Sequence, residues 1–225
     1  MSEALTILIT GTSRGIGRHL AEHYLARSAK VIGCSRGETV PISHTNYFHV
    51  RADVGDEKSV TALFKEIREK FGRLDVAINN AAINPTLSLA LMTPFTAAES
   101  ALRTNFLGTF LVSRGAAKLM MRNQFGRIIN LSSMAVRHEV SGESLYTASK
   151  AAVHAFTRVF AKEVFSFGIT CMLSVFVPGS TGVACVSAWW MFHRVSVLDT
   201  MKPCWLGRSP WGIFFWATIN NSAVS

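Results

Sequence analysis

Charged residues are scarce in this 225-residue chain, at 16% of the sequence, and acids are scarcest, at 14 against 23 lysines and arginines. The hydrophobic fraction of 49% excludes a disordered chain and is enough for a sizeable core. The basic residues form no run and do not alternate with aromatic residues, so the net charge of +9 does not indicate nucleic-acid binding. A positive balance also suits an anionic cofactor or a substrate on an acidic carrier.

Cysteines and long apolar runs are also few. Cys34, Cys171, Cys185 and Cys204 show no C-x-x-C spacing and are too few for a disulfide scaffold. No apolar run reaches the roughly 18 residues of a membrane helix. The first apolar run, residues 5–10, is too short for a signal peptide and leads directly into a glycine loop. We therefore expect a cytoplasmic protein with no membrane span.

Apolar runs alternate with helical patterns along most of the chain. Strands are predicted at residues 5–10, 30–34, 47–51, 74–79, 126–131 and 169–177, and helices at 16–27, 56–71, 96–121 and 146–167. Residues 35–46 are too short for a regular helix with its turns. Near-continuous apolar strands separated by helices predict an α/β fold with a parallel sheet covered on both faces.

A glycine loop follows the first predicted strand. Gly11, Gly15 and Gly17 stand in the pattern Thr-Gly-x3-Gly-x-Gly, and a predicted helix opens within it. These glycines permit a tight turn, a close approach of backbone to pyrophosphate, and packing of the helix on the strand, while the helix N-terminus favours phosphate. Glycines cluster in many turns, but the strand–loop–helix context indicates a dinucleotide site.

Four polar residues have the spacing of a carbonyl-reducing active site: Asn105, Ser133, Tyr146 and Lys150. Tyr146 and Lys150 stand four residues apart in a predicted helix, which places them on one face. An ammonium beside a phenol stabilises the phenolate, so Tyr146 could give or take a proton at neutral pH, as hydride transfer to or from a carbon requires.

Together these motifs resemble the short-chain dehydrogenase/reductase family, in particular its NADP-dependent carbonyl and 3-oxoacyl-carrier reductases. The resemblance covers about residues 4–179 and implies a doubly wound Rossmann sheet, a nicotinamide cofactor and no metal. It rests on the glycine loop, Asn79-Asn80-Ala81, Asn105, Ser133 and Tyr146-x-x-x-Lys150.

The resemblance also implies a role for each polar residue. Tyr146 would protonate the carbonyl oxygen as hydride arrives, and Lys150 would assist it and hold the nicotinamide ribose. Ser133 would hydrogen-bond the substrate oxygen, with Ser132 as the alternative, although its side chain would point the other way in a strand. Asn105 would support a water in a proton relay through Lys150.

The implied cofactor site draws on several loops. Asp53 would reach the adenine ring, although an Asp there is equally expected before a helix start. Asn79 and Ala81 would line the adenosine side of the cleft. The full expected set is Gly11, Ser13, Arg14, Gly15, Ile16, Gly17, Ser35, Arg36, Asp53, Val54, Asn79, Ala81, Tyr146, Lys150, Pro178, Gly179 and Thr181.

The residues after the second predicted strand favour NADP over NAD. An NAD site usually has a carboxylate there, which binds the ribose hydroxyls, whereas this chain has Cys34-Ser35-Arg36 and no acid before Glu38. Arg36 and Arg14 could both reach a 2′-phosphate, which guanidinium binds bidentately; the alternative is two solvated loop arginines. NADP makes reduction the expected direction.

Residues 180–225 depart from the family pattern and form a second segment after a Rossmann and catalytic domain at 1–179. All five tryptophans lie there, and Asp199 is the only acid after residue 168. No clean period is present, and the family's last strand is missing or altered. The segment could be an alternative or frame-shifted terminus, a divergent substrate cap, or a membrane- or partner-facing tail, of which the first is preferred.

Two functions follow as hypotheses. The first is an NADP-dependent oxidoreductase acting on a ketone or 3-oxoacyl substrate, and the second is a catalytically impaired dinucleotide-binding or interaction protein. Family members commonly form homodimers or homotetramers through two long helices, here residues 96–121 and 146–167. The apolar residues of these helices could instead belong to the core.

Overall fold

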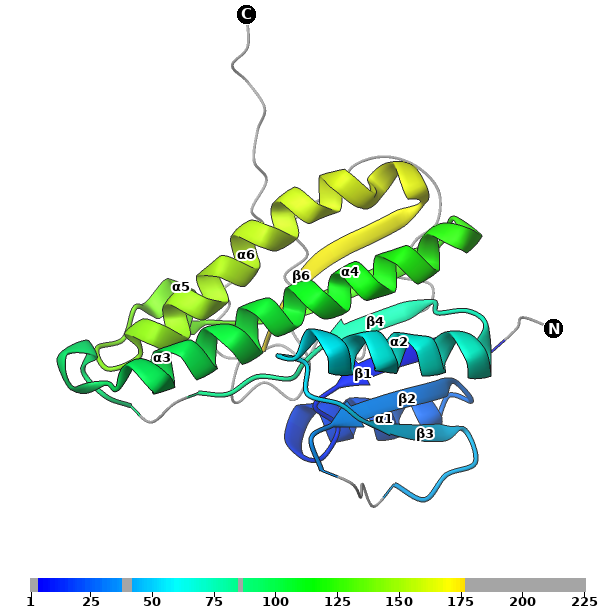
Figure 1. Cartoon of the computed structure of the whole chain (residues 1–225), viewed down its shortest axis with the longest axis horizontal. Helices are drawn as coiled ribbons and strands as arrows, with labels where there is room; N and C mark the ends of the chain where they lie inside the picture. Colours follow the sequence, from blue (N-terminus) through cyan, green and yellow to red (C-terminus); the bar gives the residue numbers. More distant parts are fainter. Residues whose placement is uncertain (1–3, 38–41, 85–86, 177–225) are drawn as a thin grey trace, which may run out of the picture. The chain divides into compact units, whose positions relative to one another are not determined.

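A single parallel sheet organises the computed structural model, which describes residues 4–37, 42–84 and 87–176. Its strands in this range are β1 (Thr6–Thr10), β2 (Lys30–Ser35), β3 (Tyr47–Arg51), β4 (Val76–Asn79), β5 (Gly126–Ser133) and β6 (Ile169–Phe176). They lie in the order β3-β2-β1-β4-β5-β6 (Figure 1). This is the predicted α/β class with the strand order of a Rossmann sheet. All strands are parallel, but the chain adds β2 and β3 on one side of β1 and β4, β5 and β6 on the other, so the order reverses between β1 and β4.

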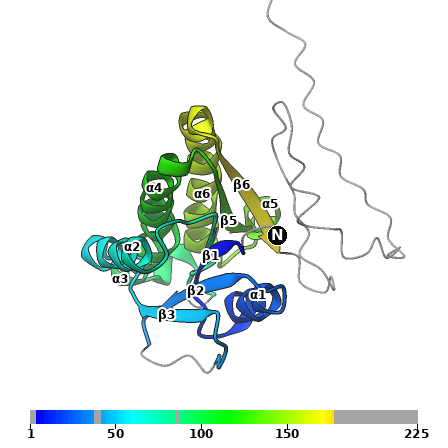
Figure 2. The same ribbon diagram turned by 90° about the vertical axis from the view of Figure 1, so that its right-hand side faces the viewer.

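Helices cover both faces of the sheet, as the apolar strands require. Figure 2 shows α1 (Gly15–Leu25) on one face and α2 (Glu57–Phe71), α4 (Gly108–Met120) and α6 (Ser144–Val164) on the other. Side chains of β1 alternate between the two cores, because neighbours in a strand point to opposite faces. Leu8 packs in the core of α2, α4 and α6, and Ile7 and Ile9 in that of α1.

The long helix predicted at residues 96–121 is interrupted. It consists of α3 (Phe95–Leu102), a π-helical turn at Arg103–Leu107, and α4, with Asn105 in the middle of the π turn. The sequence pattern does not reveal this turn, because one extra residue disturbs the periodicity only locally. Short elements were missed for a similar reason: α5 (Ala135–His138) and the 3₁₀ turn Ala90–Met92 are too short to show a period.

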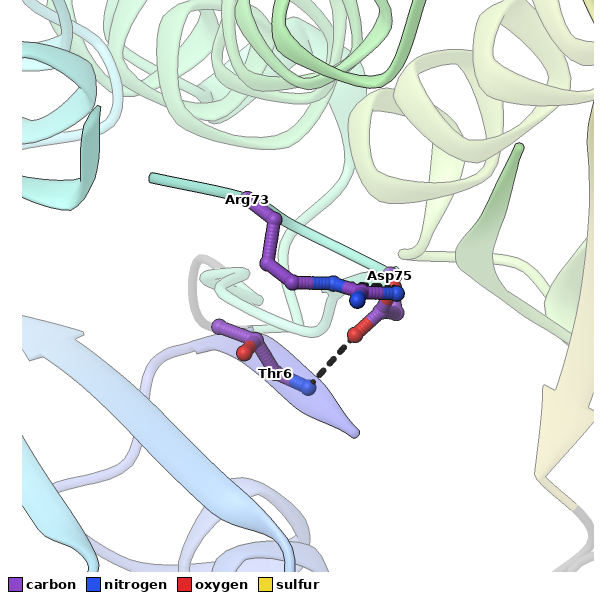
Figure 3. Close-up of polar contacts among 3 residues, drawn as sticks. All are labelled: Thr6, Arg73 and Asp75. Carbon is purple, nitrogen blue, oxygen red and sulfur yellow. Dashed lines mark hydrogen bonds and ion pairs between the residues drawn. The ribbon is translucent and has the colours of Figure 1, made fainter. Parts of the chain in front are cut away.

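A buried carboxylate joins the amino ends of β1 and β4. Asp75 is 1% exposed, and its Oδ2 accepts a hydrogen bond of 2.8 Å from the backbone N–H of Thr6 (Figure 3). Its Oδ1 accepts hydrogen bonds from Arg73, at 2.6 Å from Nη2 and 3.1 Å from Nε. A buried carboxylate is tolerated when its charge is paired and hydrogen-bonded, and Arg73 supplies the opposite charge.

The predicted residues Pro178, Gly179 and Thr181 lie outside the described residues, as do residues 180–225 and the predicted change in the last strand. Within the described range, β5 extends two residues further than predicted and ends at Ser133. The predicted catalytic serine is therefore the last residue of a strand at the carboxyl edge of the sheet.

Candidate active site

The glycine loop connects β1 to α1 at the carboxyl edge of the sheet. Gly11 and Gly15 have φ angles of +75° and +59°, which glycine adopts readily. A Cβ on Gly11 would lie 2.9 Å from Nδ2 of Asn80, whereas a Cβ on Gly15 would meet nothing within 4 Å. Gly15 therefore faces open space and leaves room for a phosphate to approach the backbone, so the loop fits a dinucleotide.

The N-terminus of α1 is suited to an anion. Arg14 precedes the helix in an extended conformation, its side chain makes no capping hydrogen bond, and the first turn contains no acid. The first N–H groups of a helix have no partner within the helix, and the helix dipole favours negative charge there. The exposed loop residues Ser13 and Arg14 and the half-buried Ile16 surround this end.

Asn80 holds the glycine loop in place, a role that the sequence analysis did not give it. Its Nδ2 donates hydrogen bonds to the backbone carbonyls of Thr10 at 2.8 Å and Gly11 at 3.3 Å. Oγ1 of Thr10 accepts the backbone N–H groups of Asn80 and Ala81, both at 3.0 Å. The loop after β4 is thereby joined to the loop after β1. Strand alternation was the available signal, because two consecutive asparagines at a strand end must face opposite sides.

The Asn79 side chain is hydrogen-bonded within the core. Together with Val54 and Ala81, Asn79 lines a gap that is too narrow for water. Its side-chain amide makes hydrogen bonds in the core beneath α4. Nδ2 donates to Oδ1 of Asn130 at 2.8 Å and to Oγ of Ser113 at 3.0 Å. Buried polar groups require partners of this kind. The Asn79 amide nitrogen therefore joins β4, β5 and α4, and the place of this residue beside the adenosine stays a prediction.

The two interpretations of Asp53 are now separated. The N-cap of α2 is Asp56, whose Oδ2 accepts the Ser59 N–H at 2.8 Å. Asp53 shapes the preceding turn, since its Oδ1 accepts the Gly55 N–H at 2.9 Å. It is half-buried next to Val54, and its predicted contact with an adenine ring stays a prediction.

The Tyr146–Lys150 pair lies on α6 against the carboxyl end of β5. Lys150 is 3% exposed, and its Nζ donates a hydrogen bond of 2.9 Å to the Leu131 carbonyl on β5. The same nitrogen lies 5.9 Å from the centre of the half-buried Tyr146 ring. On the same strand, Oγ of Ser133 accepts the Ala135 N–H at 3.1 Å, whereas Ser132 is buried. The structure thus brings an ammonium beside the phenol, as predicted.

Burial lowers the pKa of Lys150 to about 8, from 10.5 in a solvated lysine. Between these pH values the unfolded chain binds more protons than the native protein, so this residue makes the native protein more stable as pH rises. The free energy of unfolding of the wild type, minus that of Lys150→Met, should therefore be flat below pH 8 and rise towards pH 10.5. Urea unfolding across this range measures the difference.

A matched control for that experiment is Lys118→Met, because Lys118 is exposed on α4. Its difference from the wild type should not change over the same pH range. Parallel pH curves for the wild type and Lys150→Met would contradict the assigned burial of the ammonium.

Asn105 ties the loop after β4 to α6. Its Oδ1 accepts the Ile83 N–H at 2.8 Å, and its Nδ2 donates to the Ile83 carbonyl at 2.8 Å and to Oγ of Ser149 at 2.9 Å. The side chain therefore positions backbone rather than facing Lys150. The Asn105 backbone carbonyl accepts a hydrogen bond of 2.7 Å from Oγ1 of Thr109 and retains a second lone pair. The predicted water relay would depend on that carbonyl.

Arginines gather where the loops after β1, β2 and β3 meet. Arg36 is exposed directly after β2, and the glycine loop is attached to the same strand end by the Gly11 N–H, which donates to the Cys34 carbonyl at 2.8 Å. Arg51, which the sequence analysis missed, ends β3, and its Nε donates to the Arg36 carbonyl at 3.2 Å. Ser35 is less available than predicted, because it is 9% exposed and its Oγ lies 3.3 Å from Nε2 of His49.

The two long helices carry exposed apolar side chains near an aromatic cluster. The Phe156 ring on α6 packs against the rings of Phe106, Phe110 and Phe160, and Val159 on the same helix is 57% exposed. The use of these two long helices in a homodimer or homotetramer stays a prediction.

Metal-binding clusters and membrane-spanning helices are both absent from the part of the chain that the structure describes. Residues 4–37, 42–84 and 87–176 hold no group of three or more His, Cys, Asp and Glu side chains that could bind a metal ion. No helix in the same ranges is long and apolar enough to cross a membrane.

Known proteins are similar to this chain in sequence and in fold. The family model described as short chain dehydrogenase matches residues 5–190. The 3-oxoacyl-(acyl-carrier-protein) reductase FabG of Escherichia coli strain K12 is 34% identical over 182 residues, which are 79% of this chain and 73% of FabG. The corresponding reductase MabA of Mycobacterium avium is 32% identical over 174 residues, 77% of this chain and 66% of MabA.

Solved structures also have a similar fold. A short-chain dehydrogenase from Streptomyces avermitilis has a TM-score of 0.72 at 25% identity, and the match covers 84% of this chain and 70% of that one. ElxO with NADP bound also has a TM-score of 0.72, at 32% identity, and the match covers 76% and 72%. Fold and site define a dinucleotide-binding oxidoreductase. The chain belongs to the short-chain dehydrogenase family, whose chemistry acts on CH–OH or C=O groups with NAD(P).

Proposed function

We propose that this protein is an NADPH-dependent reductase of ketone or 3-oxoacyl substrates. The observation that carries the proposal is the buried ammonium of Lys150, held beside the Tyr146 phenol at the end of β5. The similarity to FabG and to ElxO, which was solved with NADP bound, supports the same reaction class and cofactor.

The proton chemistry follows from the chain's own residues. NADPH, when bound, supplies the hydride. Tyr146 donates its phenol proton to the carbonyl oxygen, and the Lys150 ammonium stabilises the phenolate that remains. Ser133, at the mouth of the site, donates a hydrogen bond to the same oxygen and stabilises its developing negative charge.

The substrate side has room for an apolar group. A cavity of about 360 Å³ lies next to the start of α6, with Leu89, Val140, Gly142 and Thr147 among its lining residues. The Ser88 N–H donates to the Gly142 carbonyl at 3.1 Å, which holds the two sides of the cavity together. Thr147 follows Tyr146 in α6, and the proposal assigns this cavity to the acyl or alkyl chain of the substrate.

The cofactor preference can be tested by titrating the purified chain with NADPH and with NADH. We expect Arg36→Ala to weaken NADPH binding about tenfold, because the variant lacks a charge-assisted hydrogen bond to the 2′-phosphate, and to leave NADH binding unchanged. Isothermal calorimetry measures both dissociation constants.

Arg122→Ala serves as the control, because Arg122 is exposed in the 3₁₀ turn Met121–Asn123, outside the candidate site. A wild-type protein that binds NADH as tightly as NADPH would contradict the NADP assignment. Steady-state oxidation of NADPH with a panel of ketones and 3-oxoacyl thioesters then separates the two functions, since a non-catalytic dinucleotide-binding protein would bind NADPH without consuming it.

A further inference from the structure

A chain of side-chain hydrogen bonds runs from the glycine loop to the loop after β2. Oγ1 of Thr12 lies 3.0 Å from the Tyr47 hydroxyl, which lies 3.3 Å from Nδ1 of His49. Nε2 of His49 is 3.2 Å from the Gly37 carbonyl and 3.3 Å from Oγ of Ser35. Neither Tyr47 nor His49 takes part in the proton chemistry proposed above, so the chain requires a separate explanation.

The Gly37 carbonyl sets the direction of this chain. A carbonyl can only accept, so Nε2 of His49 carries the proton, and in the neutral ring Nδ1 then accepts from the Tyr47 hydroxyl. Burial raises the pKa of Tyr47, so its hydroxyl keeps the proton that it donates. The Tyr47 oxygen in turn accepts from Thr12. Each hydrogen bond in the chain therefore has a defined donor, and the two loops are held in one relative position.

Neighbouring residues provide the space and a second attachment. A Cβ on Gly33 would collide with the Tyr47 hydroxyl and with Oγ1 of Thr12, so glycine at this position leaves room for their hydrogen bond. Tyr47, His49 and Arg51 alternate along β3 and share one face of that strand. Side chains of β3 thus hold the carbonyls of both Gly37 and Arg36.

We infer that His49 is a positioning residue that sets the preference of the enzyme for NADPH over NADH. This inference rests on the proposed function. His49 and Tyr47 hold the backbone of residues 35–37 against the glycine loop, so that the exposed Arg36 side chain starts from a fixed backbone beside the place proposed for the 2′-phosphate. A preorganised backbone lowers the entropy cost of ordering this loop when the phosphate binds. NADH has no 2′-phosphate, so its binding does not depend on where Arg36 lies.

The test compares dissociation constants for NADPH and NADH in His49→Leu and His49→Gln. In His49→Leu we expect NADPH to bind about tenfold more weakly, with NADH changed by less than about twofold. Glutamine keeps a donor near the Gly37 carbonyl, so His49→Gln should retain most of the preference. His44→Leu is the matched control, because His44 is exposed and its ring accepts the local Asn46 N–H, while its backbone bond to the Tyr47 N–H is kept in the variant.

The outcomes separate this inference from the proposed function. Equal weakening of both cofactors in His49→Leu, with the wild-type preference for NADPH intact, would overturn the inference alone. A wild-type protein without any NADPH preference would overturn the inference together with the proposed cofactor. If His49→Leu does not fold, Tyr47→Phe decides the question, because it removes the hydroxyl link and retains the ring. An unchanged cofactor ratio in Tyr47→Phe would then count against the inference.

Discussion

Replacing Tyr146 with phenylalanine should lower kcat for carbonyl reduction by about 10²–10⁴-fold, the usual contribution of a general acid. The phenyl ring keeps the shape of the side chain but has no proton to give to the carbonyl oxygen. Binding of NADPH should change little, because the phosphate and adenosine parts are held by loops far along the chain from α6. Stopped-flow or steady-state absorbance at the NADPH band measures kcat, and calorimetry measures the dissociation constant.

Tyr24→Phe is the matched control for that substitution. The chain has three tyrosines, and Tyr24 lies on α1, so its variant should keep wild-type turnover. Full activity in Tyr146→Phe would remove the catalytic assignment of Tyr146. A wild-type protein that binds NADPH but reduces no carbonyl on the panel would support the impaired, non-catalytic alternative.

Replacing Arg73 with methionine should lower the free energy of unfolding by about 3 kcal/mol, the lower end of the range for breaking a buried ion pair. The variant leaves the Asp75 carboxylate buried with no opposite charge, where Arg73 now donates at 2.6 and 3.1 Å. The lower end applies because the Arg73 side chain is 37% exposed, so water can partly replace it. Urea denaturation at pH 7 measures the change.

A double-mutant cycle isolates the charge effect. Asp75→Asn keeps an oxygen that can accept the Thr6 N–H, so the double variant Arg73→Met with Asp75→Asn should regain much of the lost stability. Arg73→Lys should fall between the wild type and Arg73→Met, because lysine keeps the charge without the forked geometry. Additive losses in the double variant would contradict the ion-pair explanation.

Features of the fold and site that depend on residues close together in the sequence were predictable from it. Gly11 follows β1 and Gly15 and Gly17 lie in the first turn of α1, as the strand–loop–helix pattern indicated, and the i,i+4 spacing of Tyr146 and Lys150 places both on α6. Features that depend on distant segments were not predictable. The contact between Thr12 and Tyr47 joins residues 35 positions apart, and composition and periodicity say nothing about it.

The two asparagines after β4 show where local reasoning stopped. The sequence analysis assigned Asn79 to the cofactor cleft on the basis of resemblance and left Asn80 without a role. The side-chain direction in a strand is fixed by its register, and here Asn79 faces the core beneath α4 while Asn80 faces the glycine loop. Which face holds which partner was decided by the packing of α4 and by Thr10, not by the tripeptide itself.

The π turn at Arg103–Leu107 determines how this protein would respond to the deletion of one residue. A π turn accommodates one residue more than a regular helix, so deleting a single residue there would leave α3 and α4 as one uninterrupted α-helix. The apolar faces of both halves could still pack, but residue 105 would rotate by about a quarter of a turn relative to one of them. Ile83 would then lose the amide that holds it. The deletion would therefore release the loop after β4 next to the candidate active site.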